Sequence, residues 1–430
     1  MIPLDQTALE RATAGVPQWL SARRTAGYER FDKLAMPSSQ EEVWKYVDLD
    51  FDLADFALND TPGGALTGPD EVAAAMPATA GVLRVVDGFV SLLEPVGSPG
   101  AVFDSVLAAA ADLSELLEAR YGAAIPADLD KFAAAAAAFS TDGVVVSIPA
   151  GKAVTDPFYV DVQATTPGTV SFPRVMIDVG ASAQTSLVIN YRSPHDARLI
   201  VVPDLEITAG QNANVDITIV QNWGYATRAI SHVNAVVGRD ARLQIAEAGL
   251  GGKLSRLHLS VDLEGRGSSA EILGAYFGER DQVLDYRYFM RHIGTDTDSD
   301  MFLKGGVEDE ALSVFTGMIR IEESAQKTNA FQTNRNLLLS DGAAAQSVPN
   351  LEILANDVRC GHGSTVGPLD AEQRYYLMSR GLDRARSDRL QVRGFFDQVL
   401  ARFPISELAE PISGWINEKY VAAQAEGRVA

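Results

Sequence analysis

The spacing of apolar and polar positions divides this chain into three parts. Near the N-terminus, apolar residues first recur at helical spacing and are then interrupted often by Gly, Pro and Asp. In the middle, helical spacing gives way to short β-branched runs such as Val215-Asp-Ile-Thr-Ile-Val220. Helical spacing returns near the C-terminus, where one apolar stripe runs over residues 396–403 and another over 408–420. The pattern predicts a helical and mixed region over 1–140, a β core over 141–368 and a helical region over 369–430.

A short repeat lies within the predicted β core. Four Gly-x-x-Ala segments follow one another at intervals of 30, 28 and 29 residues: Gly180–Ala183, Gly210–Ala213, Gly238–Ala241 and Gly267–Ala270. A period of this length is typical of a solenoid with one coil per repeat. We expect glycine to supply a positive φ at each corner and alanine to fit the inside of the turn. The sequence therefore predicts a mainly β protein with a parallel β-helix as its core.

Composition narrows the classes of function. The net charge of −21 argues against nucleic acid and anionic membrane surfaces as partners, because both bind clustered Lys and Arg. No apolar run approaches the roughly 20 residues of a membrane span. A single cysteine rules out a disulfide within the chain and fits a reducing compartment. We therefore expect a cytoplasmic protein.

Motifs for catalysis are missing from the sequence. There is no Gly-x-Ser-x-Gly, His-Glu-x-x-His or phosphate-binding loop, so any ATP used must bind another subunit. Gly265–Ala270 matches a dinucleotide-binding pattern, but a strand-like run follows it where a helix is required. Asp296–Asp300 begins like a calcium loop, but Met301 replaces the glycine of the sharp turn. We interpret both segments as turns and expect no enzyme.

Cys360 and His362 are the candidate metal ligands. They are two residues apart, so on a strand both side chains point to one face. A thiolate and an imidazole both bind iron or zinc, but a complete site takes about four ligands. The pair would thus be a half-site that a second chain completes. The alternative is a buried ladder, because Val358 has the same parity and cysteine is often a small buried hydrophobe. The isolated histidines are expected to be structural or at the surface: His195, His232, His258 and His292.

Several segments resemble, in order and spacing, the SufD branch of the SufB/SufD family of iron–sulfur cluster assembly proteins. The segments are Glu42-Val-Trp-Lys-Tyr46, Ala138-Phe-Ser-Thr-Asp-Gly143, Asn334-Arg-Asn-Leu-Leu-Leu-Ser-Asp341, Cys360-Gly-His362 and Tyr375-Tyr-Leu-Met-Ser-Arg-Gly-Leu382. The SufB branch is the nearest alternative. SufB-like chains usually carry Leu-Glu-His-Glu-Ala where this chain has Val358–Gly363, and tend to be longer with another cysteine upstream.

This resemblance implies a right-handed parallel β-helix that acts as a non-catalytic scaffold. Its implied partners are a SufB-like paralogue and a SufC-like ATPase, the latter docked on helices within 370–430. A transient iron–sulfur cluster would form at the joint with the paralogue, where His362 is the implied contribution and Cys360 a second candidate. The chain alone would hold no cofactor tightly, a flavin is possible in the complex, and a homodimer in isolation stays open.

Two alternatives come from other classes of protein. A β-helical carbohydrate-active enzyme would need a groove with convergent carboxylates, and no such pair stands out in the sequence. A structural β-solenoid without a metal role would need no partner.

Overall fold

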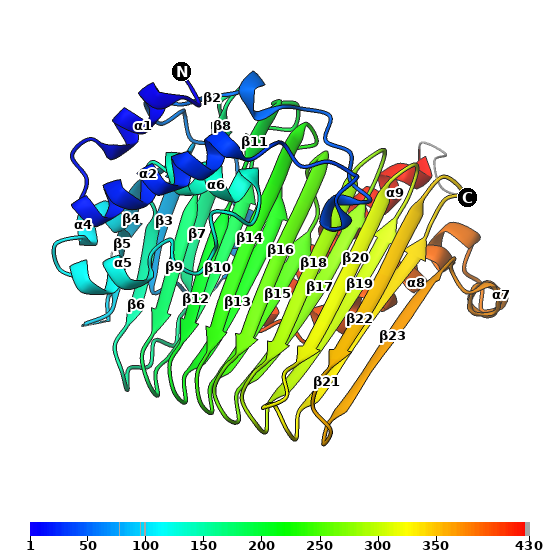
Figure 1. Cartoon of the computed structure of the whole chain (residues 1–430). Helices are drawn as coiled ribbons and strands as arrows, with labels where there is room; N and C mark the ends of the chain where they lie inside the picture. Colours follow the sequence, from blue (N-terminus) through cyan, green and yellow to red (C-terminus); the bar gives the residue numbers. More distant parts are fainter. Residues whose placement is uncertain (77, 95, 99, 426–430) are drawn as a thin grey trace.

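The protein is a solenoid in which two sheets face each other, coil upon coil (Figure 1). The computed structural model describes residues 1–76, 78–94, 96–98 and 100–425. The prediction of a mainly β protein with a β-helix core between helical regions is confirmed. Each coil gives one strand to each sheet, and consecutive coils pair in parallel. Apolar side chains of both sheets fill the space between them.

One sheet has ten strands in the described part of the chain. From the C-terminal end of the solenoid, its order is β23 (Arg359–Gly367), β21 (Asn329–Leu338), β19 (Asp298–Val307), β17 (Ser269–Gly278), β15 (Arg242–Gly249), β13 (Asn214–Asn222), β10 (Gln184–Arg192), β7 (Phe158–Gln163), β3 (Gly81–Val86) and β4 (Phe89–Glu94).

The facing sheet has eleven strands in the same described part. Its path is β22 (Ala344–Ile353), β20 (Leu312–Ile321), β18 (Val283–His292), β16 (Leu254–Leu263), β14 (Thr227–Val237), β12 (Asp204–Ala209), β9 (Arg174–Val179), β6 (Val144–Ile148) and β5 (Val102–Ser105), with β8 (Val170–Ser171) and β11 (Leu199–Val201) beside it. A further pair, β1 (Ile2–Pro3) and β2 (Ala57–Leu58), forms a small separate sheet.

The corners between the sheets show why glycine recurs. A Cβ on Gly180 would lie 2.5 Å from the backbone nitrogen of Ala150, and one on Gly265 would lie 2.0 Å from that of Arg239. The glycines therefore permit close stacking of successive coils. The positive φ that we expected of them falls instead two residues later, as at Ser182, where φ is 56°.

The fourth repeat was placed in the wrong register. Strand pairing puts Ala241 opposite Ser268, so the corner glycine of that coil is Gly265 and not Gly267. Gly267 takes the positive-φ position, with φ of 71°, and Ala270 already lies in β17. The corner has the same length as its neighbour, but Ser268 occupies the position of the alanine, so the Gly-x-x-Ala pattern matched two residues too late.

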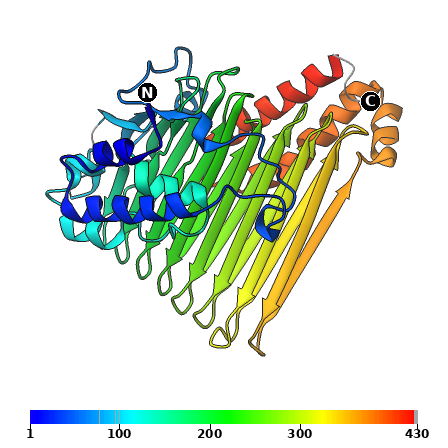
Figure 2. The same cartoon turned by 45° about the horizontal axis from the view of Figure 1, so that its top comes forward.

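Helices from the N-terminal region cover the outer face of the eleven-stranded sheet (Figures 1 and 2). The larger ones are α1 (Gln6–Thr13), α2 (Gln18–Lys33) and α6 (Lys131–Phe139). The chain between α2 and α6 also forms η1 (Glu42–Trp44), η2 (Leu53–Asp55), α3 (Glu71–Ala75), α4 (Val106–Ala109) and α5 (Ser114–Arg120). Of these, α3 packs instead with the C-terminal helices on the outer face of the ten-stranded sheet.

C-terminal helices cover the outer face of the ten-stranded sheet. They are α7 (Ala371–Ser379), α8 (Arg384–Leu400), η3 (Ser406–Leu408) and α9 (Ala409–Ala425). The two apolar stripes predicted in this region both pack inward, as Phe396 and Ile412 show. Within the described residues, no helix is both long and apolar enough to cross a bilayer.

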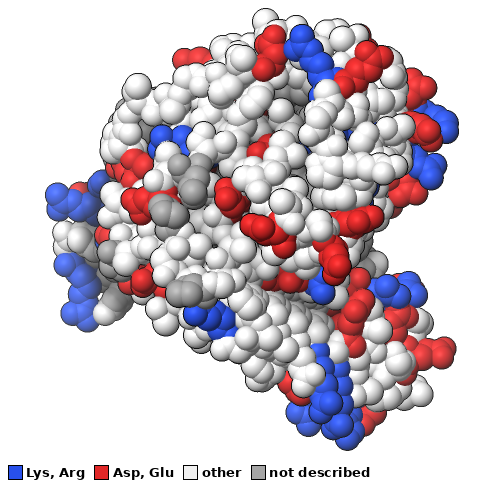
Figure 3. Space-filling model, turned by 90° about the vertical axis from the view of Figure 1, so that its left-hand side faces the viewer, with Lys and Arg blue, Asp and Glu red and all other residues white. Residues whose placement is uncertain are grey.

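The two ends of the solenoid differ. At the C-terminal end, β22 and β23 are long edge strands of 10 and 9 residues. At the other end, β4 and β5 have 6 and 4 residues and run antiparallel to their neighbours. Figure 3 faces this second end and shows Lys and Arg interspersed with Asp and Glu.

Candidate functional site

Cys360 and His362 lie on β23, the last strand of the ten-stranded sheet. Their partners in register on β21 are Ala330 and Gln332, both buried inside the solenoid. Cys360 and His362 therefore point toward the interior side of the final coil, as their common parity predicted. No further coil covers that side in the described residues, so the pair lies at the open end of the molecule.

The two side chains differ in exposure. Cys360 is half-buried and packs against the apolar core together with Val358, as the alternative of a buried ladder predicted. Burial raises the pKa of the Cys360 thiol, which disfavours the thiolate that a metal would need. His362 is exposed to solvent. Of the pair, the imidazole is the ligand that a second molecule can reach.

The interior of the last coils is polar. Gln332 donates from Nε2 to the backbone oxygen of Asn350 at 3.0 Å. Asn334 donates to the hydroxyl of Tyr276 at 2.9 Å, and that hydroxyl donates to Asn336 at 2.7 Å. Polar side chains tolerate water better than an apolar core does, so these interior positions can face the open end of the solenoid at a lower cost than apolar ones.

The edge strand also presents unpaired backbone groups. The backbone nitrogen of Arg359 donates to Thr328 on the β21 side, at 2.8 Å. Because amides alternate along a strand, those of Cys360, His362 and Ser364 point away from the sheet. These groups form a template on which another strand can pair.

A metal would find an incomplete ligand set here. In the described part of the chain, no group of three or more His, Cys, Asp and Glu side chains is arranged to hold a metal ion. Cys360 and His362 supply two soft ligands, and their Cα atoms are about 6.6 Å apart on an extended strand. Any complete coordination shell would need ligands from outside the described residues.

The remaining histidines have other surroundings. His195 is exposed beside Asp196, and His292 is buried with Nδ1 at 2.8 Å from the Thr297 hydroxyl. His232 is buried between two carboxylates, and His258 stacks on Phe289 with ring centroids 4.9 Å apart. The interpretation of all four as surface or structural residues agrees with these contacts.

Four large apolar side chains of the C-terminal helices are exposed to solvent. Tyr375, Tyr376 and Met378 on α7 are 76%, 57% and 44% exposed, and Leu390 on α8 is 48% exposed. We call these four residues the α7–α8 face. Asp370 caps α7, and Arg374 pairs with Asp388 of α8. The face is thus held on a defined pair of helices beyond β23 (Figure 2). The sequence stripes did not identify it, because they mark the buried sides of α8 and α9.

Comparison with known proteins identifies the family. Residues 162–395 match the model described as SUF system FeS cluster assembly, SufBD core domain. Residues 4–160 match the SufBD protein N-terminal region. The chain belongs to the SufBD family of iron–sulfur cluster assembly proteins. The first match spans most of the solenoid together with α7 and part of α8, so it includes Cys360 and His362.

Curated relatives agree with this assignment to the SufBD family. An iron–sulfur cluster assembly SufBD family protein of Mycobacterium tuberculosis is 31% identical over 298 residues, covering 67% of this chain and 74% of the relative. The iron–sulfur cluster assembly protein SufD of Bacillus subtilis is 28% identical over 418 residues, 94% of each chain. SufD of Escherichia coli is 29% identical over 222 residues, 52% of each. The predicted resemblance to SufD is confirmed, and the alternatives from carbohydrate-active and purely structural solenoids lose their support.

Proposed function

We propose that this SufBD protein is a non-catalytic scaffold subunit that helps to build iron–sulfur clusters at a joint with a second subunit. The observation that carries the proposal is the position of His362, an exposed imidazole on an open edge strand. The second subunit would be a SufB-like paralogue, and a SufC-like ATPase would supply the ATP hydrolysis. The cluster is cargo in this scheme, held only while it is assembled.

The open end of the solenoid supports strand pairing with the paralogue. β22 and β23 together offer two long parallel edges, and their outward amides can be satisfied by strands of a similar solenoid. Pairing there would place residues of the partner next to His362. It would also cover the polar interior formed by Gln332, Asn334 and Asn336.

The properties of the two ligands give them different roles. His362 can bind iron through a neutral imidazole without rearrangement of the core. Cys360 is half-buried and its raised pKa favours the thiol, so it joins only if partner binding or the metal itself promotes loss of the proton. Ligands from the paralogue complete the set.

The α7–α8 face supports docking of the ATPase. Its exposed tyrosines, methionine and leucine are residue types that stabilise protein interfaces. A face carried by helices next to β23 would let closure of the ATPase subunits move the joint as a rigid body.

We place the complex in the cytoplasm, and the presence of a flavin or of a homodimer stays a prediction.

The test is cluster formation by the reconstituted complex with His362→Ala. We expect cluster yield to fall at least about tenfold while the subunits still assemble, because a ligand is lost without any change in buried packing. The matched control is His195→Ala, which also removes an exposed imidazole but lies far along the chain. Unchanged yield and rate with His362→Ala would remove this residue from the mechanism.

A further inference from the structure

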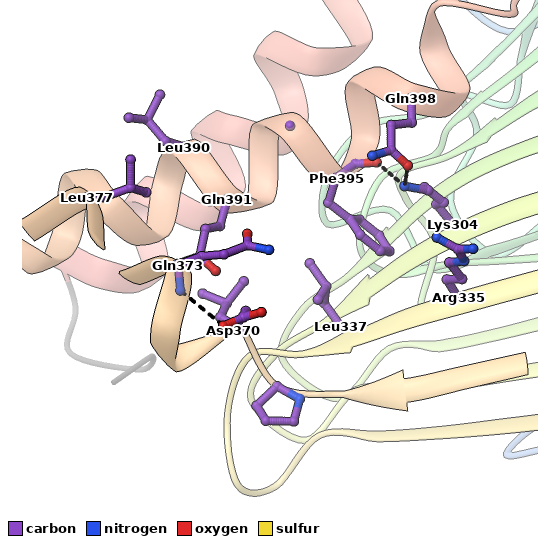
Figure 4. A pocket seen from close by; sticks show the side chains of 13 residues that line it. Lys304, Arg335, Leu337, Asp370, Gln373, Leu377, Leu390, Gln391, Phe395 and Gln398 are labelled. Atoms are coloured by element: carbon purple, nitrogen blue, oxygen red, sulfur yellow. Dashed lines mark hydrogen bonds between the residues drawn. The ribbon is translucent and has the colours of Figure 1, made fainter. Parts of the chain in front are cut away.

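A pocket lies on the outer face of the ten-stranded sheet, between that sheet and helices α7 and α8 (Figure 4). Its volume is about 490 Å³, which is within the range of small-molecule sites. Lys304 and Arg335 lie on its sheet side, Gln391 and Phe395 on its helix side. The open end of the solenoid, with His362, is not part of this wall.

Two cations lie side by side in this pocket. Lys304 on β19 is directly in register with Arg335 on β21, so both side chains leave the same face of the sheet on neighbouring strands. Strands are about 4.8 Å apart, and like charges at that spacing repel. Burial, and then the charge of Arg335, lowers the pKa of Lys304 to about 8. An anion between the two side chains would relieve this repulsion.

The neighbouring groups do not neutralise these charges. Lys304 donates to the backbone oxygen of Phe395 at 2.7 Å and to Oε1 of Gln398 at 2.6 Å, both uncharged acceptors. An ammonium has three donors, so one has no hydrogen-bond acceptor among these groups, and the ring centroid of Phe395 lies 4.2 Å from the ammonium nitrogen. Arg335 has no hydrogen bond or ion pair with any described residue. Asp370 also lines the pocket, but its Oδ1 accepts from the backbone nitrogens at the start of α7.

A third donor completes the arrangement. The Nε2 atom of Gln391 is buried and has no hydrogen-bond partner within the described chain. A buried donor without an acceptor is unfavourable, so its presence needs an explanation. Figure 4 shows the Gln391 amide pointing from α8 into the space above the strands. The apolar part of the wall includes Leu337, Leu377 and Phe395, and the polar side chains of Gln373 and Gln398 also line the pocket.

We propose that this pocket binds a small organic anion, with its carboxylate or phosphate against Arg335, Lys304 and Gln391 and its apolar body against Leu337 and Phe395. Arg335 forms charge-assisted hydrogen bonds with the oxyanion, and Gln391 donates to a further oxygen. None of these residues lies on β23, so the proposal does not rest on the ligand role of His362.

The test measures binding of three matched probes to the full chain by calorimetry. Phenyl phosphate and benzoate carry the two anionic groups, and benzyl alcohol is the neutral control. We expect one or both anions to bind and the neutral probe to bind at least about tenfold more weakly. The stronger anion identifies whether the site favours phosphate or carboxylate.

Two variants make the result specific. Arg335→Gln is expected to weaken binding of the anion at least about tenfold, and since Arg335 is exposed the variant should keep its unfolding temperature. Arg266→Gln, an exposed arginine at a corner of the solenoid, should bind like the parent. Equal binding of the neutral probe, no binding of either anion, or unchanged binding by Arg335→Gln would overturn the proposal.

Discussion

His232 and His258 lie side by side in register on β14 and β16, and their pKa values shift in opposite directions. The ring centroids are 6.5 Å apart. Burial acts to lower the pKa of His232, but the carboxylates of Asp130 and Asp204 raise it to about 9. Burial, together with the charge of His232, lowers the pKa of His258 to about 3. One ring therefore carries the charge at neutral pH and the other does not.

This difference predicts a stability that falls on both sides of neutral pH. The contribution of His232 to the free energy of unfolding is complete at pH values below about 6.5, its pKa in the unfolded state. This contribution is lost as the pH rises through 9. The His258 contribution is present above 6.5 and is lost as pH falls toward 3, because the unfolded state then binds the extra proton. For His232 the effect is on the order of 3 kcal/mol. Denaturant unfolding at a series of pH values measures both limbs.

Nitrogen chemical shifts of the two rings provide the direct check. At pH 7.5 we expect His232 to be an imidazolium and His258 to be neutral. Asp130→Asn keeps the cap of α6 but removes one carboxylate, so it should lower the pKa of His232. A neutral His232 ring in the parent protein at pH 7.5 would contradict this account.

Glycine at the corners predicts a large effect of one added methyl group. In Gly265→Ala the new Cβ would lie 2.0 Å from the backbone nitrogen of Arg239, so adjacent coils must separate. We expect a loss of about 3 kcal/mol or more in the free energy of unfolding. Gly414→Ala in α9 meets no atom within 4 Å and should stabilise the protein by up to about 1 kcal/mol. Equal unfolding curves for the two variants would show that coil stacking does not require glycine.

The edge of β23 predicts a contrast between adjacent proline substitutions. Ser364→Pro removes an outward amide, so the chain should fold normally but bind a SufB-like paralogue at least about tenfold more weakly. Thr365→Pro removes an amide that points toward β21 and should destabilise the fold itself. Ser364→Ala controls for the lost hydroxyl. Thermal unfolding and size-exclusion binding distinguish these effects, and undiminished pairing by Ser364→Pro would exclude this edge as the joint.

The solenoid could be predicted from sequence because each coil repeats the same local requirements. Short β-branched runs marked the strands, as Val215–Val220 did for β13. The shared face of Cys360 and His362 followed from parity alone. Their unequal exposure did not, because it depends on where the last coil ends and on what packs beside Val358.

Other features depend on register and could not be predicted. Lys304 and Arg335 become neighbours only through the pairing of β19 with β21, across two corners and the intervening strand β20. The error at Gly267 has the same origin, since the pairing of β15 with β17 places Gly265 at the corner and Gly267 two residues later. The exposure of Tyr375 and Tyr376 results from tertiary packing, which no local pattern encodes.

The unequal ends of the solenoid limit how large an assembly can grow. Only β22 and β23 offer long parallel edges, while β4 and β5 are short and antiparallel to their neighbours. Two molecules that join through their long edges leave no matching edge for a third, so the contact closes on itself. A rod built in this way forms a finite pair and is protected from polymerising into filaments.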